Sequence, residues 1–204
     1  MTPFTSVTCV PASLPDANVD TDIIFPARFL LLTDKLGLGR YAFYEKRYHP
    51  DGSENGDFVL NQVPYRGTQI LIAGDNFGSG SSREQAPWAM SGMGIRCIIA
   101  TGFGEIFYSN CCKNGMLPVV VGADALALLQ GDAGAALALT VDLAARAIVR
   151  ADGSAIPIAI ADWRRDALLN GWDEIAIIQN KEAANIAAFE AQQRQSMPWL
   201  YSRN

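Results

Sequence analysis

Apolar residues gather in short runs through the middle of the chain. Between these runs lie segments whose apolar residues recur at the spacing of a helix. Each run is short, rich in apolar residues and bounded by glycine or polar residues, which is typical of a buried strand. Strands are predicted over Thr68–Ala73, Ile95–Ala100 and Leu117–Val121, with helices from near Ser81 or Ser82 and over Glu105–Lys113. This βαβαβ order with short connections predicts a parallel sheet core.

The pattern changes after the third strand. Ala123–Leu129 favours another helix, and alternation then runs through residues 138–143, 147–150 and 156–160. An Asp-Gly pair lies between the last two segments, which is typical of a hairpin turn, so these strands should be antiparallel. The sequence therefore predicts an α/β fold with a mixed, partly parallel sheet flanked by helices.

The two ends of the chain are less regular. Helical periodicity covers Asp162–Asn170 and continues after Gly171 to about Gln193, and an irregular tail is expected over Met197–Tyr201. In the N-terminal third, prolines and a polar stretch from 49 to 57 indicate loops, with a brief strand candidate at Phe58–Leu60. We predict one domain over residues 1–204 with a helical C-terminal extension over about 161–204.

Composition narrows the class of protein. Half of the 204 residues are apolar, enough for a sizeable core, and the formal charge of −5 argues against a nucleic-acid binder. The first residues show no basic segment followed by an apolar run, and no stretch has the roughly 18 apolar residues that span a bilayer. No nucleic acid or membrane partner is expected, and the predicted location is the cytoplasm.

The cysteines and the histidine do not predict a metal site. The four cysteines contain no C-x-x-C pair and His49 is the single histidine, so neither a metal-ligand set held by this chain alone nor a disulfide framework is expected. The adjacent Cys111 and Cys112 are interpreted as small buried hydrophobes, the usual environment of free cysteine, with ligation or redox sensing as the alternative.

A glycine-rich run, Gly74-Asp-Asn-Phe-Gly-Ser-Gly-Ser-Ser-Arg-Glu84, follows the first predicted strand. Glycines let the backbone approach a ligand closely, and the start of a helix directs unpaired N–H groups at an anion. Ser81 and Ser82 add hydroxyls, and Arg83 adds a planar fork suited to a carboxylate. The alternative is purely structural: Ser81 caps the helix and Glu84 completes a capping box.

Two other motifs are disfavoured in this run. It matches neither the P-loop pattern nor a clean G-x-G-x-x-G followed by an acidic residue, so nucleotide binding is a weak interpretation. The nucleophile elbow G-x-S-x-G is absent, and the histidine precedes the run in a polar loop, which argues against a serine hydrolase.

Several segments together resemble a known family. Asn18-Val-Asp-Thr-Asp-Ile-Ile24 with Pro26-Ala-Arg-Phe-Leu30 is similar to the opening motif of aconitase-type swivel domains, particularly the isopropylmalate dehydratase small subunits. The glycine-rich run with Ala86-Pro-Trp-Ala89, then Ile106-Phe107 with Asn110, and Asn114-Gly-Met-Leu-Pro118 resemble later motifs of the same family. The matches span roughly residues 16 to 120 in the family's order.

The resemblance implies a swivelling β/β/α fold and a hydro-lyase activity in leucine biosynthesis. Such enzymes isomerise 2-isopropylmalate, a hydroxy-dicarboxylate, to 3-isopropylmalate through isopropylmaleate. The resemblance also implies a separate large subunit that holds a 4Fe-4S cluster, whose iron acts as a Lewis acid. This chain would then bind no cofactor or metal itself and would be active only with its partner, as a heterodimer or heterotetramer.

Roles for site residues follow from the same resemblance. Ser81 matches the family's catalytic serine, which acts as an alkoxide base, and Ser82 and Arg83 match groups that hold a substrate carboxylate. Asp22 matches an acidic residue that assists proton or water handling, with an Asx turn or cap as its structural alternative. Asp20 fits either role less specifically.

The segment Phe29-Leu-Leu-Leu32 falls where the family places its substrate-selecting loop. Relatives that act on longer tricarboxylates carry arginine at the third position, whereas Leu31 is apolar here. Leu31 and Leu32 are therefore expected to contact the isopropyl group of the substrate. Simple core packing of the adjacent leucines is the alternative.

Two positions depart from the family pattern. Gln85 stands where histidine is common, and Ser79 replaces a frequent cysteine. Glutamine keeps hydrogen-bonding capacity but carries no proton at neutral pH. Two alternatives follow: a paralogous small subunit for another substituted malate, such as citraconate/2-methylmalate, and a noncatalytic interaction domain with the same fold.

Overall fold

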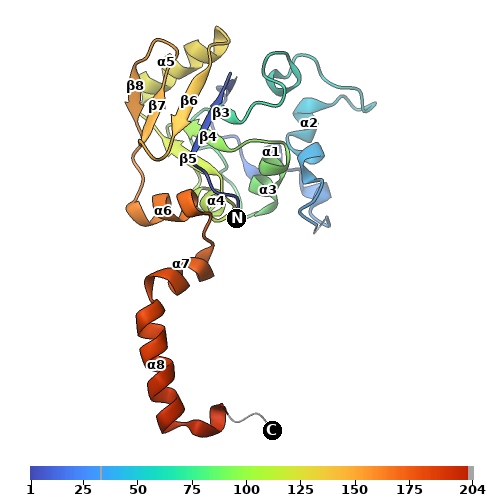
Figure 1. The fold of residues 1–204 in the computed structure, drawn as a ribbon. Helices are drawn as coiled ribbons and strands as arrows, with labels where there is room; N and C mark the ends of the chain where they lie inside the picture. The colour runs from blue at the N-terminus through green and yellow to red at the C-terminus, as the bar shows by residue number, and fades with distance from the viewer. Residues whose placement is uncertain (33, 202–204) are drawn as a thin grey trace. The chain divides into compact units, whose positions relative to one another are not determined.

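A computed structural model describes residues 1–32 and 34–201 of the chain (Figure 1). Its strands are β1 (Ser6–Cys9), β2 (Ala12–Leu14), β3 (Ile70–Ala73), β4 (Cys97–Ala100), β5 (Leu117–Val120), β6 (Leu139–Asp142), β7 (Ala147–Val149) and β8 (Ala155–Pro157). Its α-helices are α1 (Thr21–Ile24), α2 (Tyr44–Arg47), α3 (Gln85–Gly92), α4 (Glu105–Lys113), α5 (Ala123–Gly134), α6 (Asp162–Asn170), α7 (Glu174–Lys181) and α8 (Ala183–Ser196). Short 3₁₀ helices are η1 (Ala27–Phe29), η2 (Leu38–Tyr41), η3 (Val59–Asn61) and η4 (Pro198–Leu200).

The strands form two separate sheets. One is entirely parallel, in the order β2-β3-β4-β5, and the other is entirely antiparallel, in the order β1-β6-β7-β8. The predicted α/β fold with parallel and antiparallel strands flanked by helices is confirmed, but the prediction of a single mixed sheet was wrong, because each kind of strand forms a sheet of its own. The βαβαβ unit runs from β3 through α3, β4 and α4 to β5.

The parallel sheet is buried on both faces, as its continuous apolar strands require. Ile70 and Ile72 of β3 belong to a core shared with the antiparallel sheet and α5. Leu71 and Ala73, which alternate with them, belong to a second core that α1, α3 and α4 complete. Two sheets and a helical layer are therefore stacked in β/β/α order around two apolar cores.

Most predicted elements of the βαβαβ unit are confirmed, and three predictions, one of them within this unit, were wrong. The helix after the glycine-rich run begins at Gln85 rather than at Ser81 or Ser82. The strand candidate at 58–60 is the 3₁₀ helix η3, and the tail expected to be irregular includes η4. Strands β1 and β2 were not predicted, because both are short and β1 buries neither face fully.

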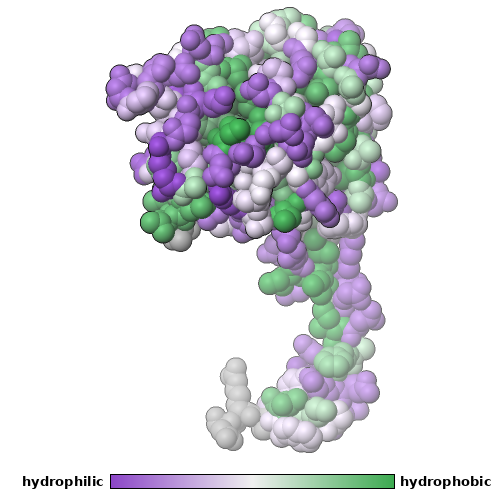
Figure 2. Space-filling view, turned by 180° about the vertical axis from the view of Figure 1, so that it is seen from behind, coloured by the Kyte–Doolittle hydropathy of each residue, from purple (hydrophilic) through white to green (hydrophobic). Residues whose placement is uncertain are grey.

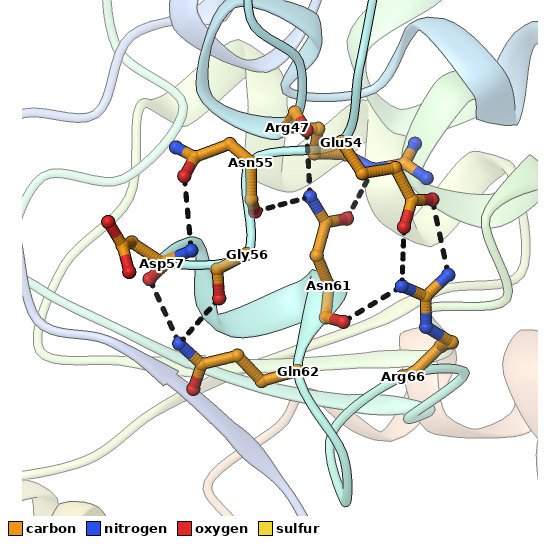
Figure 3. A network of polar contacts seen from close by, with 8 residues as sticks. All are labelled: Arg47, Glu54, Asn55, Gly56, Asp57, Asn61, Gln62 and Arg66. Carbon is orange, nitrogen blue, oxygen red and sulfur yellow. Dashed lines mark hydrogen bonds and ion pairs between the residues drawn. The ribbon is translucent and has the colours of Figure 1, made fainter.

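Polar side chains stabilise the long excursion between α2 and β3 (Figure 3). The Asn61 amide donates to the backbone carbonyls of Arg47 (2.7 Å) and Asn55 (2.9 Å). Arg66 forms a bidentate ion pair with Glu54 and also donates to the Asn61 carbonyl. These bonds satisfy the backbone of a segment without sheet partners, and they explain why residues 59–61 turn instead of extending.

The chain divides into two compact units, Met1–Gly171 and Trp172–Asn204, and the second is described to Tyr201. Gly171 ends α6 in the left-handed conformation, with φ of 67°. Helices α7 and α8 bury no residue, and several of their apolar side chains, including Ile175, Ile178 and Phe189, are exposed. Figure 2 shows apolar residues on the surface of this unit. The last three residues of the predicted extension lie outside the described part.

Candidate active site

Three loops meet at one edge of the parallel sheet. They follow the carboxyl ends of β2, β3 and β4, at residues 15–20, 74–84 and 101–104. In open α/β sheets, ligands bind beyond the carboxyl ends of the strands. The glycine-rich run occupies the middle loop, so it lies between the other two.

Backbone hydrogen bonds fix the glycine-rich loop on both sides. On one side, Gly78 N donates to Val19 O (2.7 Å) and Thr21 N donates to Ser79 O (2.9 Å). On the other side, Phe77 N donates to Gly102 O (3.0 Å) and Gly104 N donates to Phe77 O (2.9 Å). The loop thus continues the strand pairing beyond the sheet, and its backbone has little freedom to move.

Gly78 is required at its position for two reasons. Its φ of 73° lies in the left-handed region, and a Cβ there would overlap the ring of Phe107. Phe107 is fully buried on α4 and makes an edge contact with Phe77, with ring centroids 5.6 Å apart. The glycine therefore allows the loop to lie directly on the first turns of α4.

Ser81 is held by a buried threonine. Its Oγ lies 2.9 Å from Thr21 Oγ1, and Thr21 is only 1% exposed. Glu84 stands at the N-cap of α3 and makes no side-chain cap bond. The capping box predicted as the structural alternative is therefore wrong, because the Ser81 hydroxyl faces the α1 segment and not the start of α3.

Arg83 and Asp22 form an ion pair between the glycine-rich loop and α1. The Arg83 side chain is 21% exposed and that of Asp22 is 53% exposed, so solvent reaches both groups. The cap expected before Ile23 is made by Asp20, whose Oδ1 accepts from Ile23 N at 2.8 Å. Asp20 is thus structural, whereas Asp22 is free of the cap and faces Arg83.

A pocket of about 430 Å³ opens beside this loop. Gly78–Ser82 line one wall, and Gly104–Phe107, the first turn of α4, line the other. Unpaired N–H groups in a helix's first turn favour an anion, whereas the Glu105 carboxylate in the same turn opposes one. The sequence assigned this role to the start of α3, whereas α4 supplies the first helical turn that lines the pocket.

Leu31 and Leu32 lie outside this pocket, in the segment before η2. They line a separate hollow of about 360 Å³ together with Asp34, Leu36, Gly37, Leu38, Arg40 and Tyr41. Leu31 is 93% exposed, so core packing is wrong for this side chain. The structure brings Ser81, Arg83 and Asp22 together through Thr21 and the Arg83–Asp22 pair, and it does not bring the two leucines into that group.

Two of the four cysteines, Cys97 and Cys111, are buried, and Cys9 and Cys112 are half-buried. Burial raises the pKa of the Cys111 thiol and raises that of Cys112 to about 11, with Arg164 opposing the shift at Cys112. Both groups are thiols at neutral pH, as expected of structural cysteines. Within residues 1–32 and 34–201, no three His, Cys, Asp or Glu side chains are grouped to hold a metal ion.

Sequence reasoning missed two parts of the site. Thr21 gave no signal of its own, although it lies inside the Asn18–Ile24 motif. The first turn of α4 was predicted as a helix start. The only feature of the sequence that could have indicated its close approach to the glycine-rich loop is the pair of glycines at 102 and 104. A Cβ on Gly104 would lie 2.6 Å from Gly78 O, so this close approach also depends on glycine.

Comparisons with known proteins agree along the whole chain. A family model described as the aconitase C-terminal domain matches residues 1–124, and a model for the C-terminal domain of the 3-isopropylmalate dehydratase small subunit matches residues 181–203. The 3-isopropylmalate dehydratase small subunit of Paracoccus denitrificans is 49% identical, over 98% of this chain and 100% of its own length. That of Brucella anthropi is also 49% identical over the same shares.

The β/β/α layers and the loop at the sheet edge define a swivel domain of the aconitase type. A solved structure of 3-isopropylmalate dehydratase from Methanocaldococcus jannaschii has this fold, with a TM-score of 0.65, 22% identity, and coverage of 90% of this chain and 99% of that one. With relatives 49% identical over their whole length, the particular family is also clear. The chain belongs to the 3-isopropylmalate dehydratase small subunits, and the resemblance found in the sequence is confirmed.

In the described part of the chain, no helix combines the length and apolar character needed to cross a bilayer.

Proposed function

We propose that this chain is the small-subunit half of a cytoplasmic hydro-lyase that interconverts 2-isopropylmalate and 3-isopropylmalate through isopropylmaleate, in leucine biosynthesis. The observation that carries this proposal is the placement of Ser81 and Ser82 in the wall of a pocket, with Arg83 next to them on the same fixed loop, in a chain of this family. We further propose a single swivel domain with a helical extension from about residue 161.

The chemistry requires a base and fixed positive charge together. Dehydration removes a proton from the carbon next to a carboxylate, and negative charge then develops on that carboxylate. We assign the base to Ser81, whose alkoxide would take the proton. A hydroxyl proton donated from Thr21, 2.9 Å away, would stabilise this alkoxide.

Ser82 and Arg83 are assigned to the substrate carboxylate. Ser82 is exposed and lines the pocket, so its hydroxyl is available to a ligand. Arg83 carries five N–H donors in a planar fork, and the pair with Asp22 leaves donors for a second carboxylate. Asp22 orients Arg83, and its exposed carboxylate is the group we assign to proton or water handling.

The partner is the large subunit, as the name of the relatives implies. We propose that this partner holds a 4Fe-4S cluster, which supplies Lewis-acid activation of the departing hydroxyl when bound. This chain would bring the base and the carboxylate site to the shared active site, and Leu31 and Leu32 would contact the isopropyl group. No turnover is therefore expected from this chain alone.

A substrate panel tests this function against the alternatives that Gln85 raised. The reconstituted pair should turn over 2-isopropylmalate with a kcat/KM at least about tenfold above that for 2-methylmalate, because each methylene missing from an apolar pocket costs about 1–3 kcal/mol. A preference for 2-methylmalate would identify the paralogous dehydratase. Binding of the large subunit with an intact cluster, but without turnover of either substrate, would identify a noncatalytic domain.

Arg83→Lys should raise the KM for 2-isopropylmalate by about tenfold or more, because lysine cannot make the planar bidentate contact with a carboxylate. Steady-state kinetics of the reconstituted pair measure this effect. Arg66→Lys is the matched control, since Arg66 also pairs with a carboxylate, that of Glu54, but lies outside the glycine-rich loop. An unchanged KM in Arg83→Lys would remove Arg83 from substrate binding.

A further inference from the structure

The segment that carries Leu31 and Leu32 is anchored at both ends. Before it, Phe29 packs against Tyr41 and Tyr44, with ring centroids 4.5 and 5.1 Å away. After it, Gly39 of η2 lies against Gly92 at the end of α3, so closely that a Cβ on Gly92 would lie 2.9 Å from Gly39 N. The described residues between these anchors, 30–32 and 34–37, are mostly exposed.

A third contact fixes the middle of the segment. The Lys35 ammonium lies 4.3 Å from the ring centroid of Trp88 on α3, and it is also 3.5 Å from Asn114 Oδ1. Trp88 Nε1 donates to the same oxygen at 2.9 Å, and the Asn114 amide donates to Asn110 O at 2.8 Å. Lys35 thus contacts an aromatic face and an oxygen whose orientation is already fixed.

We infer that Lys35, Trp88 and Asn114 form a latch, with Lys35 as a positioning residue. The latch holds the leucine segment, described at residues 30–32 and 34–37, in its substrate-contacting position. Trp88 is partly buried in the core, so it is a fixed platform, whereas Lys35 is the movable partner. Trp88 lies on α3, and this helix starts two residues after Arg83. The same helix therefore supports the leucine segment and directly follows the proposed carboxylate site in the sequence. This inference rests on the proposed function.

The latch should affect substrate affinity more than the chemical step. When only a fraction of the molecules has the binding-competent arrangement, the apparent dissociation constant equals the intrinsic constant divided by that fraction, while the bound complex reacts as before. Loss of a partly exposed cation–π contact is expected to lower the population of the binding-competent arrangement about threefold to tenfold. The contact involves no atom of the proposed base or of its partner Thr21.

The first readout uses this chain alone. In Lys35→Met, chymotrypsin cleavage after Leu31, Leu32 or Leu36, followed by mass spectrometry, should be about threefold to tenfold faster than in the wild type. Lys35→Arg should restore slow cleavage, because arginine also stacks on tryptophan. Lys46→Met removes an exposed lysine from α2 and is the matched control. Equal cleavage in Lys35→Met and the wild type would overturn the latch.

The second readout uses the reconstituted pair. Lys35→Met should raise the KM for 2-isopropylmalate about threefold to tenfold with kcat within about twofold, and Lys35→Arg should restore the KM. Trp88→Leu removes the platform but keeps the charge, and it should raise KM similarly, with no further rise in the double variant. Trp88→Met, which keeps apolar bulk but has no aromatic face, replaces it if the leucine variant does not fold.

The outcomes separate this inference from the proposed function. A raised KM in Lys35→Met with an unchanged KM in the Trp88 variants would mean that Lys35 binds substrate directly, and would overturn the latch. Absence of turnover by the wild-type pair with an intact cluster would overturn the proposed function, whereas the cleavage readout would still decide whether the latch exists.

Discussion

Replacing Ser81 by alanine is expected to lower kcat of the reconstituted enzyme by about 10²- to 10⁴-fold, the usual contribution of a positioned acid or base. Alanine removes the only atom of this side chain that could accept the proton. The KM should change little, because Ser82 and Arg83 remain to bind the carboxylate. The measurement is steady-state turnover of 2-isopropylmalate by the variant mixed with the large subunit.

The fold of Ser81→Ala should be nearly unchanged. The variant leaves Thr21 Oγ1 without its Ser81 partner, which should cost about 1 kcal/mol of unfolding free energy. Ser91→Ala is the matched control, since Ser91 is an exposed serine on α3 outside the pocket. Retention of more than about a tenth of the wild-type kcat would contradict the assignment of Ser81 as the base.

Gly78→Ala should have the largest effect on stability, lowering the free energy of unfolding by about 3 kcal/mol. The new Cβ would overlap the buried Phe107 ring, and the residue would also be strained at φ of 73°. Relief of the overlap requires movement of α4 or of the loop, so the pocket should be distorted as well. Chemical denaturation followed by circular dichroism measures the stability change.

Gly52→Ala separates the two causes. Gly52 has a similar φ of 85°, but nothing lies within 4 Å of the position of its added Cβ. It should therefore lose only about 1 kcal/mol, from backbone strain alone. Equal losses in the two variants would show that contact between the glycine-rich loop and α4 contributes nothing to stability.

The pattern of apolar and polar residues predicted those helices and strands whose formation depends mainly on residues close by in the sequence. Strands β3 to β5 were predicted because their apolar runs are continuous, and α4 and α6 were predicted with their observed bounds. The start of α3 was not, because residues 81–83 are engaged by Thr21 and Asp22, some 60 positions earlier. Such a contact leaves no trace in local periodicity, and helical signals alone favoured a capping box.

The candidate site was also predictable from the sequence only in part. Motif order suggested that Asp22 and the Ser81–Arg83 run share a site, and the structure brings them together. Resemblance could not reveal that Thr21 holds Ser81, that the first turn of α4 lines the pocket, or that Lys35 reaches Trp88. These contacts depend on the packing of loops from three strands, which only the folded chain defines.

The central claim is that the active site is shared between this chain, which provides Ser81, and an iron–sulfur large subunit. The most direct test is anaerobic turnover of 2-isopropylmalate by the two chains mixed, with each chain alone as control. We expect turnover only in the mixture, with isopropylmaleate as the intermediate. Equal turnover by the large subunit alone, or none in a mixture whose cluster is intact, would contradict the account.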